Sequence, residues 1–146
     1  MNAMSKEEAI VVTRSLNLPD VVFKIIDDKV PDKLVNYFST PMVFDLTSKE
    51  QAEYGFGKIL PLWSTSNGDI VFAYDFFKDD YFSFNWSGDV MKRFPSWNEL
   101  ISDSISRVME ITWDEQSEDE IFQLLTDIFT PFEIKDINSI FQKILK

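Results

Sequence analysis

The sequence predicts an α+β fold, in which an antiparallel β-meander of about four strands is flanked by N-terminal and C-terminal helices. Between Leu60 and Trp86, short apolar segments are separated by an Asn-Gly turn and an Asp-rich turn. Such punctuation is typical of strands joined by tight turns. On both sides of this stretch, apolar residues recur at helical spacing. Because helices, sheet and helices follow in blocks rather than in alternation, the order favours α+β over α/β.

The length and composition indicate one globular domain spanning residues 1–146. Hydrophobic residues make up 45% of the chain, and fourteen Phe with four Trp supply bulky core material. No apolar run approaches the ~20 residues that span a bilayer. The segment Met1–Glu8 turns acidic where a signal peptide would be apolar. We therefore expect a cytoplasmic protein that has no membrane partner.

The residues before the meander predict several short elements. Ser5 and Glu8 have the spacing of a capping box, and Ser48 and Gln51 repeat it. Proline at the start of a segment suits the first turn of a helix or the start of an edge strand. The expected elements are a helix to about Leu16, a helix from Pro19, a helix over Pro31–Phe38, an edge strand over Pro41–Leu46 and a helix over 48–54.

Alternation along the meander assigns side chains to its two faces. Ile70, Phe72, Tyr74 and Phe76 share one face of the middle strand. On the third strand, the shared face carries Phe82, Phe84 and Trp86. We expect one face of the sheet to be core and the other to be only partly covered.

Three amphipathic helices are predicted after the meander. Ser96 and Glu99 form the strongest helix start in the chain, and Ser117 and Glu120 form another capping box. Pro131 is expected to end the second of these helices. The last helix begins at about Asp136, and its apolar residues are Ile137, Ile140, Phe141, Ile144 and Leu145.

The chain contains no cysteine and no histidine, which excludes several chemistries. Disulfides, thiolate metal sites, Cys-His dyads, Ser-His-Asp triads and histidine metal sites all require one of these residues. Any catalysis would have to use carboxylates, Lys, Tyr or backbone amides.

The formal net charge is −11, and most of it lies in one segment. Residues 75–120 contain twelve acidic and four basic side chains, so this segment carries a net charge of −8. Such a field repels phosphate backbones and anionic membranes, and it favours basic partners. We therefore expect no direct binding to nucleic acid, although surface charge also serves solubility alone.

Carboxylates in the turns of the meander are the candidates for chemistry. Two of Asp69, Asp75, Asp79 and Asp80 could face one cleft, as in a glycoside hydrolase. Adjacent Asp residues, however, commonly do no more than favour a turn. The chain also lacks the ligand spacing of a calcium-binding EF-hand loop. We expect no enzyme, no metal and no cofactor, and the alternative is a carboxylate-based hydrolase that acts on glycosides.

The favoured function is an interaction surface on the meander. Acidic residues around an aromatic side chain suit a cationic protein face, because charge steers encounter and the ring adds affinity. The predicted partner-binding residues are Asp69, Asp75, Asp79, Asp80, Tyr81 and Asp89. Trp63, Trp86, Trp97 and Trp113 could instead form a ligand cage, but most of them occupy predicted core positions, where packing is the default.

A series of short motifs runs through most of the chain. Val30-Pro31 is followed by Leu34 and Tyr37, and Leu60-Pro61-Leu62-Trp63 leads through Asn67-Gly68-Asp69 to Ala73-Tyr74-Asp75. Phe94-Pro95-Ser96-Trp97 then precedes Leu100 and Ile101. From about Leu18 to Val108, this order resembles the SUKH superfamily of α+β proteins.

Many members of the SUKH superfamily serve as immunity proteins to bacterial toxins. The resemblance therefore implies a protein that binds a cognate toxin domain and blocks it. A nuclease toxin would also fit the charge, because enzymes that cleave nucleic acid need basic surfaces. A general intracellular scaffold is the remaining alternative, and the sequence leaves the identity of the toxin and the oligomeric state open.

Overall fold

A computed structural model describes residues 4–134 and 136–145 and confirms the α+β class. Residues 1–3 of the acidic N-terminal segment and the side chains of Ser48 and Leu145 lie outside this description. The elements are α1 (Lys6–Ser15), α2 (Asp20–Ile26), β1 (Phe38–Ser39), η1 (Met42–Asp45), α3 (Ser48–Ala52), β2 (Ile59–Thr65), β3 (Ile70–Asp75), β4 (Asp80–Asn85), β5 (Val90–Phe94), α4 (Trp97–Thr112), α5 (Glu118–Phe129), η2 (Thr130–Phe132) and α6 (Ile137–Leu145).

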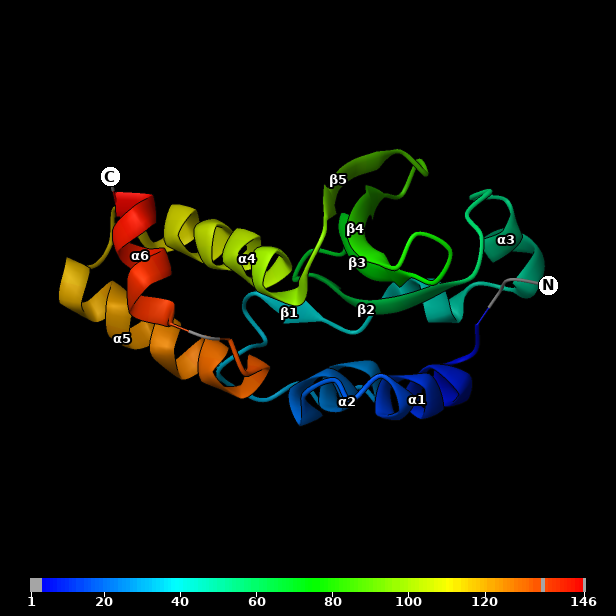
Figure 1. Ribbon diagram of the computed structural model, residues 1–146, viewed down its shortest axis with the longest axis horizontal. Coiled ribbons are helices and arrows are strands. Elements are labelled where there is room, and N and C mark those ends of the chain that lie inside the picture. Colours follow the sequence, from blue (N-terminus) through cyan, green and yellow to red (C-terminus); the bar gives the residue numbers. More distant parts are fainter. Residues whose placement is uncertain (1–3, 135, 146) are drawn as a thin grey trace.

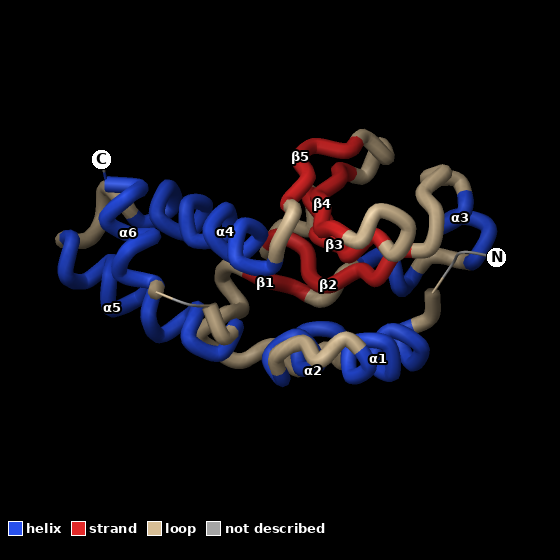
Figure 2. The backbone as a smooth tube through the Cα atoms, viewed as in Figure 1, coloured by secondary structure: helices blue, strands red, loops and turns tan. Residues whose placement is uncertain are grey.

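The strands form one antiparallel sheet in the order β1-β2-β3-β4-β5, so the meander has five strands rather than about four. Figure 1 shows α1 and α2 lying along one side of the sheet, while α4, α5 and α6 group together at the end of the molecule opposite α3. Figure 2 shows the strands between these groups of helices. Within the described residues, no helix is long and apolar enough to cross a membrane.

The larger hydrophobic core lies between the sheet and the helices α1, α2, α4 and α5. Trp63 and Phe72 enter it from the sheet, and Phe129 and Phe132 enter it from the C-terminal helices. Each of these side chains is at most 2% exposed. The ring centroids of Trp63 and Phe132 are 5.4 Å apart at an interplanar angle of 74°, an edge-to-face contact. Burial of such aromatic side chains is the main stabilising term of the fold.

A smaller core covers the other face of the sheet. Val71, Ala73, Phe82 and Phe84 are buried there, with Tyr54, Phe56 and other partly buried side chains packed over them. The predicted assignment of side chains to faces is therefore confirmed for β3 and β4. The Phe82 face, however, belongs to the smaller core rather than to the larger one.

A β-bulge in β2 changes the face of the strand on which the Trp63 side chain lies. Pro61 pairs with Ala73, but the next pair is Trp63 with Phe72, so Leu62 is the extra residue. Strict alternation would put Leu62 and Trp63 on opposite faces of the strand. With the bulge, both side chains enter the larger core. Pro61 has no backbone N–H to donate, and such residues are tolerated at bulges.

Three of the four predicted helix caps are confirmed. The side chains of Ser5, Ser96 and Ser117 accept hydrogen bonds from backbone amides in the first turns of α1, α4 and α5. The capping box of α3 lies one residue earlier than predicted, with Thr47 and Glu50 in the roles assigned to Ser48 and Gln51. Pro131 follows the end of α5, as expected, and lies in η2.

Two predicted elements are wrong. Residues of the predicted helix Pro31–Phe38 form hydrogen-bonded turns, and Phe38 pairs with Thr65 in β1. The predicted strand Pro41–Leu46 is the short helix η1, in which Val43 joins the smaller core. In each case a short apolar run fits both helix and strand, and its burial against the sheet decides between them.

The strand β5 was not predicted, because its sequence lacks a buried face. Val90 and Met91 are 44% and 52% exposed, and Lys92 follows them in the strand. Pairing with β4 and the ion pair formed by Arg93 hold this edge strand in place.

Candidate functional site

The six residues predicted to bind a partner lie at the two ends of the β3–β4 hairpin. Asp69 precedes β3 and Asp89 follows β4, at the end where Ile70 pairs with Asn85. The other four lie at the opposite end: Asp75, Asp79, Asp80 and Tyr81. Because each strand residue advances the chain by about 3.3 Å, these two groups are on the order of 17 Å apart. The structure therefore brings four of the six together and leaves two apart, and the role in partner binding stays a prediction.

Two of the predicted acidic residues form an ion-pair cluster with Arg93. The guanidinium donates to Asp80 from Nε at 2.9 Å and from Nη2 at 2.8 Å, and Nη2 also donates to Asp75 at 2.6 Å. The Arg93 side chain lies over the ring of Phe82, with 4.9 Å between its guanidinium carbon and the ring centroid. Both carboxylates are hydrogen-bonded within the fold, and Arg93 offsets one of their two charges.

The Asp75 carboxylate also stabilises the turn that joins β3 to β4. Its Oδ1 accepts hydrogen bonds from the backbone amides of Phe77 and Lys78 at 2.9 and 3.2 Å. Burial raises the pKa of Asp75, but the hydrogen bonds from Arg93 and from these amides outweigh burial and leave the pKa below its ordinary value. A general acid needs a raised pKa, so Asp75 does not suit the acid role in the glycoside hydrolase alternative.

Asp79 and the two tyrosines beside it complete this end of the hairpin. The Tyr74 hydroxyl donates a hydrogen bond to Asp79 Oδ1. This hydrogen bond, followed by burial, raises the pKa of Tyr74 to about 12. Burial, followed by the charge of Asp79, raises the pKa of Tyr81. Both hydroxyls are therefore protonated at neutral pH, and that of Tyr74 donates to Asp79.

A second acidic surface lies where α4 ends and α5 begins. Residues 108–134 contain eight acidic side chains and no basic one. We define the α4–α5 corner as the exposed residues Glu110, Ile111, Trp113, Asp114, Glu115, Glu118, Asp119 and Glu120. In Figure 1 this corner is at the end of the molecule opposite α3. From the sequence, this region was seen only as part of the acidic segment 75–120, because acidic residues alone do not reveal exposed apolar neighbours.

The two halves of the corner differ electrostatically. Glu118–Glu120 occupy the first turn of α5, where the helix dipole favours negative charge. Glu110 lies in the last turn of α4, which has no basic residue, and Asp114 and Glu115 follow the end of that helix. Negative charge at a helix C-terminus opposes the dipole. Ile111 is 64% exposed and Trp113 is 48% exposed beside these charges.

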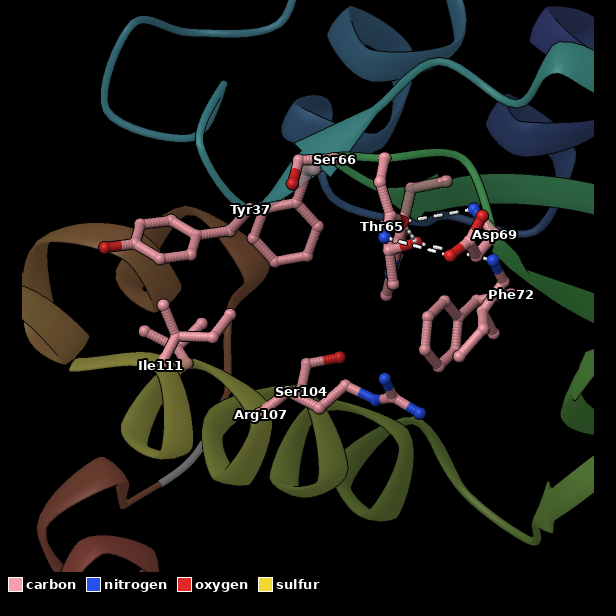
Figure 3. A pocket seen from close by; sticks show the side chains of 13 residues that line it. Tyr37, Thr65, Ser66, Asp69, Phe72, Ser104, Arg107 and Ile111 are labelled. Atoms are coloured by element: carbon pink, nitrogen blue, oxygen red, sulfur yellow. Dashed lines mark hydrogen bonds between the residues drawn. The ribbon is translucent and has the colours of Figure 1, made fainter. Parts of the chain in front are cut away.

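A cavity of ≈ 240 Å³ lies between α4 and the turn that joins β2 to β3. Figure 3 shows Thr65, Ser66, Asp69 and Phe72 on one side of it, with Ser104, Arg107 and Ile111 of α4 opposite. We call this cavity the Trp63 pocket. Its remaining wall residues are Tyr37, Phe38, Trp63, Asn67, Ile70 and Val108.

The turn above the Trp63 pocket is fixed by side-chain hydrogen bonds. Thr65 Oγ1 donates to Asn67 Oδ1 at 2.7 Å, and Asn67 Nδ2 donates to Asp69 Oδ2 at 3.0 Å. Gly68 has a φ of +80°, which suits glycine because a Cβ disfavours the left-handed region. The carbonyl of Gly68 accepts a hydrogen bond from the indole of Trp86. The rim of the pocket is therefore ordered.

The four tryptophans do not form a cage. Trp63 and Trp97 are in edge-to-face contact, with 5.9 Å between their ring centroids. Trp86 instead lies beside Tyr54, and Trp113 is at the α4–α5 corner. Packing, the default expectation, is confirmed for Trp63, which is 1% exposed. The sequence did not predict that this core tryptophan also lines a pocket.

No family model, curated protein or solved structure matches the chain. The resemblance to the SUKH superfamily accordingly stays a prediction. In the described part of the chain, no group of three or more acidic side chains is arranged to hold a metal ion.

Proposed function

We propose that the chain is a non-catalytic binding protein that captures a partner with a basic surface, and that this partner is a bacterial toxin domain. The observation that carries the proposal is the α4–α5 corner, where exposed Trp113 lies among acidic side chains that no basic residue of 108–134 offsets. An aromatic anchor within a charged rim is the composition of many protein interfaces.

The placement of the charges supports binding rather than stability. Glu110 lies at the C-terminal end of α4, where its charge opposes the helix dipole, and Asp114 and Glu115 follow directly. A basic partner would neutralise these charges, and their field would speed its approach. By contrast, Asp75 and Asp80 both bind Arg93, which offsets one of their two charges. The α4–α5 corner is therefore the strongest candidate for the docking face.

The class of partner follows from charge and from the resemblance to the SUKH superfamily. The net charge of −11 disfavours nucleic acid and favours cationic proteins. Nuclease domains of toxins carry basic surfaces for their substrates, so an acidic protein can occupy those surfaces. We propose such a domain as the cognate partner, bound in the cytoplasm of a bacterial cell.

Co-expression with a panel of toxin domains, some nucleases and some not, tests the proposal. The chain should restore growth against one nuclease domain and fail against the others. The variant E110Q/D114N/E115Q should lose this rescue without losing stability, because it removes charges that oppose the dipole of α4. Failure to rescue growth from any nuclease domain, or rescue by this variant equal to wild type, would contradict the proposal.

The matched control is E7Q/E8Q, which removes two exposed charges at the start of α1, outside the α4–α5 corner. These charges favour the helix dipole, so the control should lose stability as well as charge. If rescue depends on stability alone, only the control should lose it. If rescue depends on the docking face, E110Q/D114N/E115Q should lose it while it stays folded.

A further inference from the structure

We propose that Asn67 is a site of spontaneous deamidation, and that the turn between β2 and β3 controls the rate of this reaction. The inference is independent of the proposed partner, because it rests on one dipeptide and on the hydrogen bonds around it. Asn67 is the one asparagine of the sequence that precedes a glycine. It is exposed and lies at the rim of the Trp63 pocket.

The reaction joins two atoms of neighbouring residues. The backbone nitrogen of Gly68 attacks Cγ of Asn67, the new N–C bond closes a succinimide ring, and the Cγ–Nδ2 bond breaks. Nδ2 leaves as ammonia, with the proton that the Gly68 nitrogen gives up. Water then opens the ring at either carbonyl, which yields aspartate or isoaspartate. Glycine favours the attack because it has no side chain beside its nitrogen, and asparagine is a thermolabile residue.

The folded turn restrains the attacking nitrogen. The N–H of Gly68 donates to the Thr65 carbonyl at 2.8 Å, and Gly68 is buried. The nitrogen attacks only after a base from the solvent has removed its proton. A hydrogen-bonded and buried amide is protected from such a base, as it is from hydrogen exchange. Deamidation therefore requires the turn to open.

Side-chain hydrogen bonds restrain the carboxamide that is attacked. Oδ1 of Asn67 accepts from Thr65 Oγ1 at 2.7 Å and from the Asp69 amide at 3.1 Å. Nδ2 donates to Asp69 Oδ2 at 3.0 Å, and dashed lines mark these contacts in Figure 3. The carboxamide cannot reorient without breaking them. The two donors also polarise the carbonyl, but this has no effect while the Gly68 nitrogen keeps its proton.

Deamidation would loosen the turn and change its charge. In the product, a carboxylate replaces the amide that now donates to Asp69, so two like charges face each other and repel. Isoaspartate also inserts an extra carbon into the backbone. The Gly68 carbonyl, which accepts from the Trp86 indole, lies within this turn. The modified chain should therefore lose the ordered rim of the Trp63 pocket.

The experiment incubates the full chain in mildly alkaline buffer, with and without urea. Peptide mapping by mass spectrometry follows aspartate and isoaspartate at each asparagine. In urea, Asn67 should react faster than the other asparagines, including Asn138, which precedes a serine. In native buffer, Asn67 should react about tenfold more slowly or less, because several hydrogen bonds must break first.

Substitutions test the control by the turn. Thr65→Val removes the hydroxyl that donates to Asn67 and accepts from the Ile70 amide at 3.3 Å. Asp69→Ala removes the acceptor of Nδ2 at an exposed residue, so it should keep the fold. Both should speed the native reaction severalfold and leave the rate in urea unchanged. The matched control is Thr126→Val on α5, which removes a hydroxyl bond to the Phe122 carbonyl and should change neither rate. Circular dichroism will show that each variant is folded.

Three outcomes would overturn the inference. The first is an equal rate at Asn67 in native buffer and in urea, which would mean that the turn exerts no control. The second is a different asparagine as the main site of reaction in urea. The third is a native rate in folded Asp69→Ala and Thr65→Val that equals the wild-type rate.

Discussion

Arg93 forms a bidentate ion pair with Asp80, with donor–acceptor distances of 2.9 Å from Nε and 2.8 Å from Nη2. The same guanidinium reaches Asp75 at 2.6 Å. Because these residues lie on β5, β4 and β3, one side chain ties three strands together at the edge of the sheet. The Arg93 and Asp75 side chains are 30% and 13% exposed, so water screens this cluster only in part.

Replacement of Arg93 by Met should lower the free energy of unfolding by ~1–3 kcal/mol, because it leaves two half-buried carboxylates without their donor. Urea denaturation measures the change. The matched control is Lys92→Met, whose side chain is 61% exposed in its pair with Asp103, and it should cost at most about 1 kcal/mol. Equal effects of the two substitutions would contradict this account of β5.

Acid should remove the stability that Asp75 contributes. Its pKa in the folded protein is lower than in the unfolded chain, so its contribution is complete above the unfolded value of about 4 and is lost as the pH falls below that value. The stability difference between wild type and Arg93→Met should therefore shrink on acidification. Urea denaturation across this range tests the sign, and a difference that grew in acid would refute it.

The pKa of Tyr74 should depend on its hydrogen bond to Asp79. The hydrogen bond to Asp79 raises its pKa to about 12, so its contribution to stability is complete below about 10 and is lost as the pH rises toward 12. Asp79→Asn should return the Tyr74 pKa toward the ordinary value, and Asn suits the φ of +52° at this position. Ultraviolet titration of tyrosinate, with Tyr74→Phe to assign the signal, measures this. Asp89→Asn, at the far end of the hairpin, should change nothing.

The turn over the Trp63 pocket should depend on Gly68. A Cβ at this residue would meet Met42 Sδ at 3.2 Å, and φ is +80°. Gly68→Ala should cost about 1–2 kcal/mol of stability, the usual penalty of left-handed backbone for other residues. At Gly57 an added Cβ would meet nothing within 4 Å, so Gly57→Ala should be neutral or slightly stabilising in the same thermal unfolding assay. Equal melting temperatures for the two variants would count against the proposed turn.

The sequence predicted the parts of the fold that have local signals. Capping residues such as Ser96 and Ser117, and the turns between the central strands, are encoded by neighbouring residues. The short segments Pro31–Phe38 and Pro41–Leu46 were assigned wrongly because tertiary contacts decide their conformation. The strand β5 carries no alternation, since Val90 and Met91 are exposed.

The candidate sites were harder to predict than the fold. Asp75 and Asp80 were predicted to bind a partner, and nothing in the sequence indicated their ion pairs with Arg93, which is distant in the chain. The bulge that directs Trp63 into the pocket depends on the register between β2 and β3, which a single strand does not reveal. For the α4–α5 corner, the sequence indicated only the acidic excess of residues 75–120 and not the exposed Trp113.

The proposed capture of a basic toxin domain is tested most directly by the salt dependence of association with the domain that co-expression identifies. Stopped-flow measurement should give a rate constant that falls steeply with ionic strength for wild type, because acidic residues steer the encounter. The variant E110Q/D114N/E115Q should associate more slowly and with a flatter salt dependence, and D79N/D80N/D89N should change less. A wild-type rate constant that does not vary with salt would contradict the claim that this chain works through an acidic docking face.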